Sequence, residues 1–465
     1  MGAAVSDWRL AKAVSSFGQL GVVSGTAIDL VLARRLQRGD YGGHCRRALE
    51  AFPFGETAER ILNTYYVVGG ISENQPFKSV PMHTYEGSRR AQELAVAANF
   101  VEVYLAREGH GNAVGINYLE KIQLPHLPSL YGAMLAGVDY VIMGAGIPLE
   151  IPGALDALSE NRPASYPLRV TGAKHGEVFR LHFDPSALFE VPLPQLKRPN
   201  FLPIIASDTL AVMLTRKANG RIDGFVIEGP TAGGHNAPPR GALKLTDDGQ
   251  PIYGERDIVN LETMRELGLP FWLAGSYGTA QRLQEAFNLG AAGIQVGTPF
   301  ALCAESGLCT SVRRALMAKA VKGAASVFTD PCASPAGFPF KVAQLEDTLS
   351  DNEVYESRER LCDLGYLREA YRKDDGTVGF RCPGEPVHAY VKKGGKPEDA
   401  IGKKCLCNGL SADIGLGQYR GDGTYEQPLV TLGDDYINAA RFCHNGSTDF
   451  SAADVLEKLL CTVRY

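Results

Sequence analysis

The sequence has no long hydrophobic run, no block of like charge and no low-complexity tract. No segment holds the ~18 consecutive apolar residues that a membrane-spanning helix needs, so we expect no membrane partner. The formal net charge is −5, with acidic and basic residues spread along the chain, which argues against a nucleic-acid partner. The first residues, MGAAVSDWRLAKAVSSFG, lack the basic end, apolar centre and cleavage site of a secretory signal, so we expect a cytoplasmic protein.

Cysteine occurs at an ordinary frequency, with ten residues in 465 and none of the close spacing of small disulfide scaffolds. We therefore expect free thiols or a metal site in place of disulfides. Cys362, Cys382, Cys405 and Cys407 lie in the last third of the chain. Four thiolates can close a zinc site, but only Cys405 and Cys407 form a close pair. Free cysteines are the favoured interpretation, and we assign no metal.

Short runs rich in Val and Ile alternate with helical patterns through the first 300 residues, which predicts a parallel sheet buried on both faces. Helical periodicity is clear in residues 88–109 and 279–290, where Leu283, Phe287 and Leu289 suggest a buried stripe. The runs are LGVVSG (20–25), AVGINYL (113–119), DYVIMGAG (139–146), LPIIAS (202–207), GFVIEG (224–229), PFWLAGS (270–276) and AGIQVGT (292–298).

The number of runs is one short of a closed barrel. A (β/α)8 TIM barrel needs eight strands, and we count seven. Residues 7–17 are typical of a helix and lead directly into the first run. We therefore expect a TIM barrel whose first strand is missing or truncated, with Met1 and Gly2 as its end or another segment in its place. An open doubly wound sheet is the alternative.

The character of the chain changes near residue 305. We predict a barrel domain over residues 1–305, interrupted by an inserted ribbon or loop at 165–194. Residues 306–445 are rich in Gly, Pro and charge with little periodicity, and we expect an elaboration packed on the barrel, with an active-site lid as one role. Residues 446–465 should end the chain in a helix for which Ser451 is the N-cap.

Two glycine-containing loops follow the last two predicted strands. Gly275 and Ser276 follow one strand, and Gly297 and Thr298 follow the next. In TIM barrels, phosphate is often held by the loops after strands seven and eight. Glycine lets backbone N–H groups approach an anion, and hydroxyl groups add donors. The pair of loops predicts a phosphate site, and small residues that merely end two strands are the alternative.

One histidine follows the neighbouring strand, in the stretch EGPTAGGHNAPPRG at residues 228–241. Gly233 and Gly234 precede His235 and place it on the rim of the expected barrel. An ordinary imidazole pKa of about 6.5 suits proton transfer near neutral pH. We therefore regard His235 as the candidate catalytic residue and the other eight histidines as bystanders.

Three stretches together resemble the nitronate monooxygenase family, formerly called 2-nitropropane dioxygenase. They are AVGINYL, EGPTAGGHNAPPRG and PFWLAGSYGTAQRLQEAFNLGAAGIQVGTPFALCAES, in matching order and spacing over residues 1–310. Members of that family are FMN-binding TIM barrels, and their relatives include FMN-dependent enoyl-acyl-carrier-protein reductases. The resemblance implies an FMN-dependent oxidoreductase.

The resemblance also implies a role for each matching residue. His235 would be the catalytic base, although Thr231 stands where the family usually has an acidic residue. Phe338 and Phe340 would cover the flavin, unless they are ordinary core residues. The implied FMN-binding residues are Asn117, Gly233 and Gly234 at the ring, and Gly275, Ser276, Gly297 and Thr298 at the phosphate.

The implied reaction is oxidation of a nitronate or nitroalkane by O2, which gives a carbonyl compound and nitrite. Its partners would be the small-molecule substrate and O2. One alternative is an enoyl-thioester reductase that uses NAD(P)H and an acyl thioester. Others are a non-catalytic phosphate- or flavin-binding module, and a flavin-free aldolase or isomerase that would use Glu228 at the end of its strand.

Overall fold

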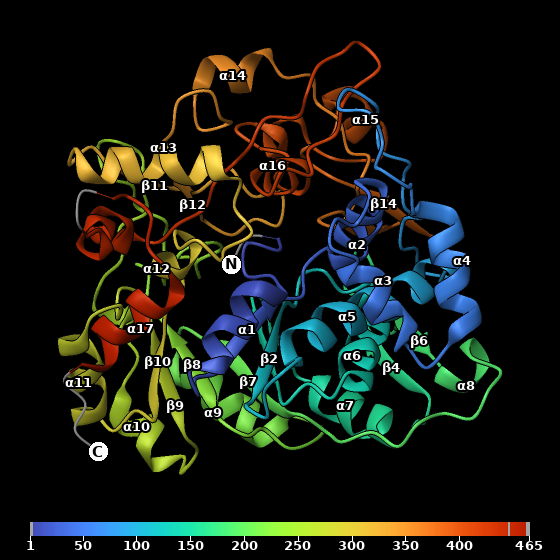
Figure 1. The fold of residues 1–465 in the computed structure, drawn as a ribbon, viewed down its shortest axis with the longest axis horizontal. Coiled ribbons are helices and arrows are strands. Elements are labelled where there is room, and N and C mark those ends of the chain that lie inside the picture. Colours follow the sequence, from blue (N-terminus) through green and yellow to red (C-terminus); the bar gives the residue numbers. More distant parts are fainter. Residues whose placement is uncertain (1–2, 445–446, 462–465) are drawn as a thin grey trace.

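The computed structural model describes residues 3–444 and 447–461 (Figure 1). Its main sheet has seven parallel strands in chain order, without a reversal. This order is that of a β/α barrel and excludes a doubly wound sheet, in which the strand order reverses at a switch point. All seven predicted strands are confirmed. They are β1 (Gly21–Ser24), β2 (Val114–Leu119), β3 (Tyr140–Gly144), β7 (Asn200–Ile205), β8 (Phe225–Glu228), β9 (Phe271–Ala274) and β10 (Gly293–Gln295).

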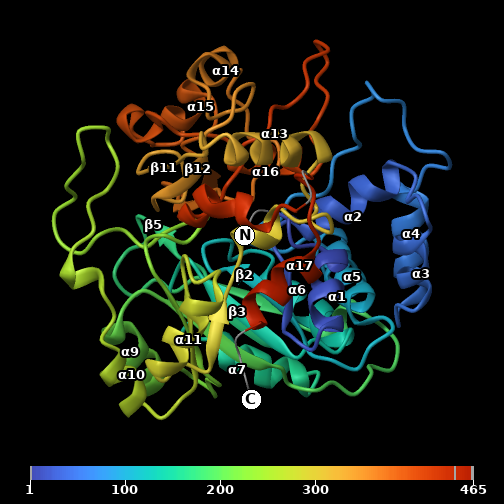
Figure 2. The same ribbon diagram turned by 60° about the vertical axis from the view of Figure 1, so that its left-hand side comes forward.

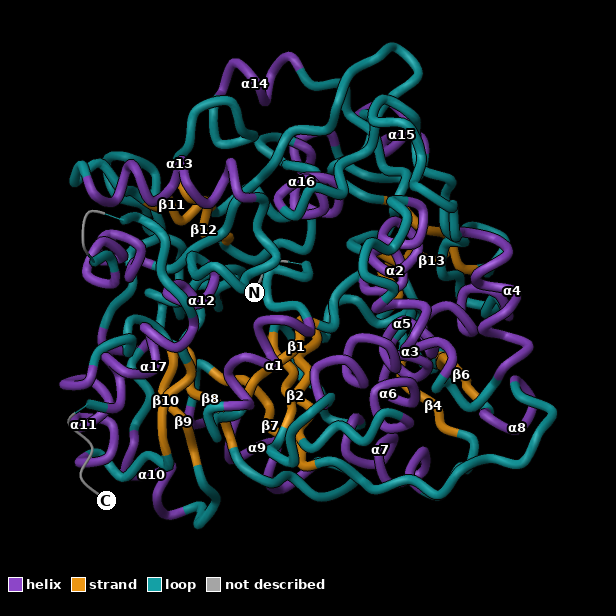
Figure 3. The backbone as a smooth tube through the Cα atoms, in the orientation of Figure 1, coloured by secondary structure: helices purple, strands orange, loops and turns teal. Residues whose placement is uncertain are grey.

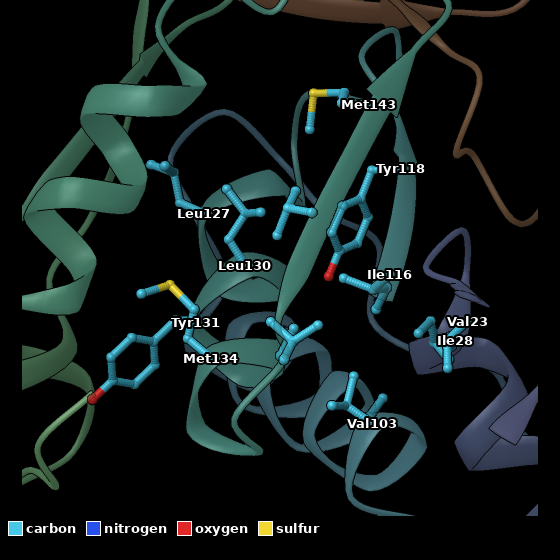
Figure 4. Packing of buried hydrophobic residues seen from close by; sticks show 14 of the residues in the cluster. Val23, Ile28, Val103, Ile116, Tyr118, Leu127, Leu130, Tyr131, Met134 and Met143 are labelled. Atoms are coloured by element: carbon cyan, nitrogen blue, oxygen red, sulfur yellow. The ribbon is translucent and has the colours of Figure 1, made fainter. Parts of the chain in front are cut away.

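The two faces of the sheet bury separate sets of apolar side chains, because successive residues of a strand point to opposite faces. On the outer face, strand residues such as Val23 and Ile116 pack against helices, as Figure 4 shows for Leu127 and Leu130 of α6. On the inner face, a second cluster is formed by Ile142, Leu202, Val226 and Ala274.

Helices follow the strands and cover the outer face. The helices of the barrel half are α1 (Trp8–Ser16), α2 (Ile28–Gln37), α3 (His44–Glu50), α4 (Gly55–Tyr65), α5 (Arg89–Arg107), α6 (His126–Leu135), α7 (Ile151–Ser159), α9 (Asp208–Lys217), η1 (Glu255–Asp257), α10 (Leu261–Glu266), α11 (Ala280–Asn288) and α12 (Thr298–Ala301). Side chains of Asp7, Ser88 and Thr279 cap the first turns of α1, α5 and α11.

The predicted stripe on α11 is wrong in two of its three members. Leu283 is buried, but Phe287 and Leu289 are 39% and 40% exposed. Leu289 is the C-cap of α11, beyond its last helical residue, and Ala286 shares the buried face with Leu283. A small alanine therefore takes the position for which the sequence pattern favoured a larger side chain.

Residues 4–6 lie in part of the place expected for the first barrel strand. The N–H of Ser24 donates to the carbonyl of Ser6 at 2.8 Å, and the N–H of Gly307 donates to the carbonyl of Val5 at 2.8 Å. A Cβ on Gly307 would lie 2.0 Å from the carbonyl oxygen of Ala4, so only glycine permits this approach. The segment thus joins β1 to the turn beyond β10. Met1 and Gly2 lie outside the described residues.

The predicted insertion at 165–194 is a β-ribbon. Strands β4 (Ala164–Pro167) and β6 (Arg180–Phe183) pair antiparallel, and α8 (Pro185–Leu188) follows them. Between them, β5 (Val170–Thr171) pairs with β13 (Glu369–Arg372) of the C-terminal region. The insertion therefore connects the barrel half to the elaboration.

Residues 306–444 form a second layer above the barrel half (Figure 2), and much of this layer is loop (Figure 3). Buried side chains of this layer, such as Phe340 and Leu406, pack with Leu30 and Ile122 from the segments that follow β1 and β2. The layer therefore covers the carboxyl ends of the barrel strands. Its elements are α13 (Thr310–Val321), β11 (Val327–Asp330), β12 (Phe340–Ala343), α14 (Asn352–Ser357), β13 (Glu369–Arg372), β14 (Val378–Arg381), α15 (Val387–Lys392), η2 (Pro397–Ala400), α16 (Leu406–Asp413) and η3 (Asp434–Phe442).

The last helix, α17 (Ala452–Leu460), begins at a capping box in which Ser451 and Asp454 bond each other's backbone N–H groups. The predicted helix and its N-cap are confirmed. The described residues contain no helix that is both long and apolar enough to span a membrane.

Candidate active site

The loop after β9 presents a row of open backbone N–H groups. Gly275 has φ 95° and Ser276 has φ 56°, so two successive left-handed residues turn the chain sharply. Among the described residues, the N–H groups of Ser276, Tyr277 and Gly278 have no hydrogen-bond acceptor. Successive unpaired N–H groups in a turn form an anion-binding concavity. This geometry fits the phosphate group that the sequence predicts here.

The second predicted phosphate loop, after β10, is open on one side and occupied on the other. A Cβ added to Gly297, the N-cap of α12, would meet nothing within 4 Å. Thr298 is buried, and its Oγ1 accepts the N–H of Gly433 at 2.8 Å. Its hydroxyl proton remains available to a ligand, because a threonine hydroxyl both accepts and donates.

The loop that carries His235 lies against the first phosphate loop. A Cβ on Gly275 would be 2.9 Å from Oγ1 of Thr231, so the turn after β8 and the turn after β9 are in contact. Thr231, which stands where the family usually has an acidic residue, thus lies at this contact. The structure brings together the histidine loop and the candidate phosphate loop after β9, as their places on neighbouring strands predict.

Residues 431–434 from the C-terminal layer close the histidine loop from above. Oγ1 of Thr431 accepts the N–H of Gly234 at 2.8 Å, and the N–H of Asp434 donates to the carbonyl of Thr231 at 3.0 Å. A Cβ on Gly233 would lie 2.7 Å from the nitrogen of Gly433. Packing against Gly433 is therefore enough to explain why position 233 is a glycine. The contact of Gly233 and Gly234 with a flavin stays a prediction.

His235 contacts β12 and the loop that precedes this strand. Its backbone forms an antiparallel bridge with Phe340, and its Nε2 lies 2.7 Å from Oγ of Ser334. The ring centroids of Phe340 and Phe338 lie 4.8 Å and 6.2 Å from that of His235, both edge-on. The two phenylalanines therefore enclose the imidazole, and whether they also cover a flavin stays a prediction.

Burial changes the protonation of two groups at this end of the barrel. It lowers the pKa of His235 to about 3 and raises the pKa of Glu228 to about 7. Glu228 ends β8 two residues after Val226, which belongs to the inner cluster, so Glu228 also points to the barrel interior. His235 is neutral at pH 7, and Glu228 is divided between its two forms.

Asn117 provides the fourth part of the site. It pairs in register with Ser24 and Ile142, and it shares the inner face with Ile142. The Asn117 side chain is buried, and its Oδ1 has no hydrogen-bond partner among the described residues. A buried amide oxygen without a partner is costly and fits a ligand that donates a hydrogen bond there.

The four cysteines remain thiols. Cys362, Cys382, Cys405 and Cys407 form no disulfide, and the part of the chain that the structure describes holds no group of three or more His, Cys, Asp or Glu arranged for a metal ion. A hydrogen bond from Cys382 lowers the pKa of Cys362. Elemental analysis of the purified protein would test for bound metal.

Residues 173–332 match the sequence model of the nitronate monooxygenase family. The resemblance seen in the sequence is confirmed over this segment, which contains His235 and both candidate phosphate loops. No curated protein matches the chain in sequence.

Several solved structures resemble the fold. Nitroalkane oxidase from Streptomyces ansochromogenes aligns with a TM-score of 0.48 at 15% identity, over 99% of this chain and 93% of its own. FabK from Thermotoga maritima aligns with a TM-score of 0.45 at 15% identity, over 98% and 88%. The enoyl reductase domain of MlnA from Bacillus amyloliquefaciens aligns with a TM-score of 0.44 at 11% identity, over 99% and 92%.

Sequence reasoning missed three residues of the site. Ser334, Thr431 and Gly433 contact His235, Gly234 and Thr298 from about 100 to 200 residues away along the chain. All three lie in the region that has little periodicity. The only local signal was the Gly and Ser content of their segments, which is also typical of ordinary loops.

Proposed function

We propose that this protein is an FMN-dependent oxidoreductase that oxidises nitronates with O2 at the carboxyl ends of its barrel strands. The observation that carries the proposal is the contact of Thr231, in the loop of His235, with Gly275, which begins the turn that bears the open N–H groups of residues 276–278. The loop that carries the histidine thus lies against a candidate anion site on a β/α barrel. The match of residues 173–332 to the nitronate monooxygenase family supports the same assignment.

The residues of the rim suit FMN at both of its ends. The N–H groups of residues 276–278 and the open face at Gly297 would hold the phosphate. The unpartnered Oδ1 of Asn117 would accept a hydrogen bond from the ring. When bound, FMN supplies a two-electron acceptor that O2 can reoxidise.

The electrostatics of His235 favour a nitronate over a nitroalkane as substrate. A group whose pKa is about 3 is a weak base, so removal of a proton from carbon is unfavourable. A nitronate has already lost that proton. The neutral imidazole can instead donate an N–H hydrogen bond to a negatively charged oxygen. The low pKa of His235 therefore argues against the role of catalytic base that the resemblance implies for it.

An enoyl-thioester reductase is the second candidate, and the same observation favours it. A neutral N–H donor beside the flavin would polarise the thioester carbonyl while hydride passes to the double bond. NAD(P)H would then supply the electrons, and an acyl thioester would be the substrate. The two candidates share the cofactor site and differ in the electron donor.

Titration of the purified chain with FMN tests the shared part. We expect flavin absorbance to remain with the protein after gel filtration, and a folded protein that stays colourless in excess FMN would contradict both candidates. Anaerobic mixing then separates them. Bleaching by a nitronate but not by NAD(P)H supports the oxygenase, and rapid bleaching by NAD(P)H supports the reductase. A flavin that neither compound reduces would support the non-catalytic module.

A further inference from the structure

The hydroxyl group of Ser334 lies where it can determine which nitrogen of His235 carries the proton. Ser334 belongs to the loop between β11 and β12 and is fully buried. Its Oγ is 2.7 Å from Nε2 of His235, a short distance for a hydrogen bond between a hydroxyl and a ring nitrogen. Among the described residues, Nδ1 of His235 has no hydrogen-bond partner and is the ring nitrogen left for a substrate.

The hydrogen bonds of Ser334 decide the direction of this contact. Its Oγ already accepts the N–H of Ala336 at 3.1 Å. A serine hydroxyl has one proton to donate, and a buried hydroxyl proton needs an acceptor. Within the described residues, the acceptor available to that proton is Nε2 of His235. If Nε2 carried its own proton and donated it to Ser334, the hydroxyl proton would be left buried without a partner.

The surroundings hold the ring in the orientation that points Nε2 at Ser334. Phe338 and Phe340 stand edge-on to the imidazole. The backbone on both sides of His235 is paired, with the N–H of Lys341 on the carbonyl of Gly234 and the N–H of Asn236 on the carbonyl of Pro339, each at 2.9 Å. The orientation of the imidazole is therefore set by packing as well as by Ser334.

We propose that Ser334 is a positioning residue that holds His235 as the tautomer with its proton on Nδ1. In this tautomer His235 donates an N–H hydrogen bond to a negatively charged substrate oxygen and does not remove a proton. The inference rests on the proposed function for the identity of the substrate. It deepens that function, since a donor at this position selects the nitronate anion over the neutral nitroalkane.

Nitrogen NMR of the histidine side chains tests the tautomer directly. The full chain would be labelled with 15N-histidine, and the signals of His235 would be assigned as those lost in His235→Gln. We expect a protonated, pyrrole-like Nδ1 and a pyridine-like Nε2. A protonated Nε2 would overturn the proposal. The measurement needs neither FMN nor activity, so it can fail while the proposed function stands, and the reverse also holds.

Variants of Ser334 test its positioning role. Ser334→Ala should give signals of mixed tautomers and lower kcat/KM for a nitronate by about tenfold, the effect of one hydrogen bond. Ser334→Thr keeps the hydroxyl and should restore both the Nδ1–H tautomer and the rate. Ser411→Ala is the matched control, because Ser411 is a buried serine whose hydroxyl bonds the carbonyl of Cys407. Unchanged His235 signals in Ser334→Ala, or equal changes in Ser411→Ala, would refute the role of Ser334.

Discussion

The Nζ of Lys341 lies 2.7 Å from Oδ1 of Asp434 and so ties β12 to the first turn of η3. Lys341 is buried, and its other partner is Oγ1 of Thr329 at 2.8 Å. Lys341 follows the residue that bridges His235, and Asp434 bonds the loop of Thr231. This ion pair therefore connects the two segments that enclose the histidine loop.

Asp434→Asn should destabilise the protein, because it leaves the Lys341 cation buried without its counter-charge. Asp434 is 39% exposed, so we expect a loss of about 1–3 kcal/mol, less than for a fully buried pair. Urea denaturation would measure it. Glu346→Gln is the control, because it breaks an ion pair of similar length with Lys319 in which Glu346 is 74% exposed. An equal loss of unfolding free energy in both variants would contradict the idea that the burial of Lys341 makes its ion pair more important.

Two glycine substitutions should separate cofactor binding from folding. Gly297→Ala adds a methyl group that meets no protein atom within 4 Å, so the melting temperature should stay the same while FMN affinity falls. Gly233→Ala places its methyl group 2.7 Å from the nitrogen of Gly433, so the melting temperature should fall. Differential scanning fluorimetry and FMN titration measure the two effects. Unchanged FMN affinity in Gly297→Ala would argue against a phosphate at this loop.

His235→Ala should leave FMN bound and lower turnover of the preferred substrate by at least about 100-fold, the low end for loss of a hydrogen-bond donor to a negatively charged oxygen in an active site. Flavin absorbance and steady-state kinetics measure the two properties in the same preparation. His182→Ala removes an exposed histidine of the ribbon and should change neither. Normal turnover in the His235 variant would end the assignment of this residue.

His126 should make stability depend on pH. It is buried, its Nε2 bonds the carbonyl of Glu120 at 3.0 Å, and burial lowers its pKa to about 4. Above pH 6.5 neither the folded nor the unfolded chain protonates this residue. Between about pH 6.5 and pH 4 only the unfolded chain binds the proton, so the free energy of unfolding falls with falling pH, by about 3 kcal/mol in total.

Chemical denaturation across this pH range would measure the effect of His126. His126→Gln should reduce the pH dependence between pH 6.5 and pH 4 by about 3 kcal/mol, while His235 and Glu228, whose pKa values are also shifted, still contribute to it. His175→Gln, at an exposed position, should leave the whole profile unchanged. Equal profiles for the wild type and His126→Gln would show that this histidine is not the cause.

Most of the barrel could be predicted from short stretches of sequence. Each strand lies in a run of β-forming residues, nearly all of these runs end in Gly, Ser or Thr, and each of α1, α5 and α11 begins at a capping side chain. These signals are local, because they depend on residues a few positions apart. The exposed Phe287 shows the limit of such signals, since an apolar residue in a helical pattern does not say which neighbours will cover it.

Local sequence was enough to predict the seven strands and the loops that carry His235, Gly275 and Gly297, but the order in which the strands pair was established by the fold. Runs of β-forming residues and the conformational freedom of glycine act over a few residues, and they require no knowledge of the rest of the chain. The bond of Ser334 to His235 and the packing of residues 431–434 over its loop come from long-range contacts that the sequence pattern does not show. Those contacts join segments about 100 to 200 residues apart, and they form because the C-terminal layer buries its apolar side chains on the carboxyl ends of the barrel strands.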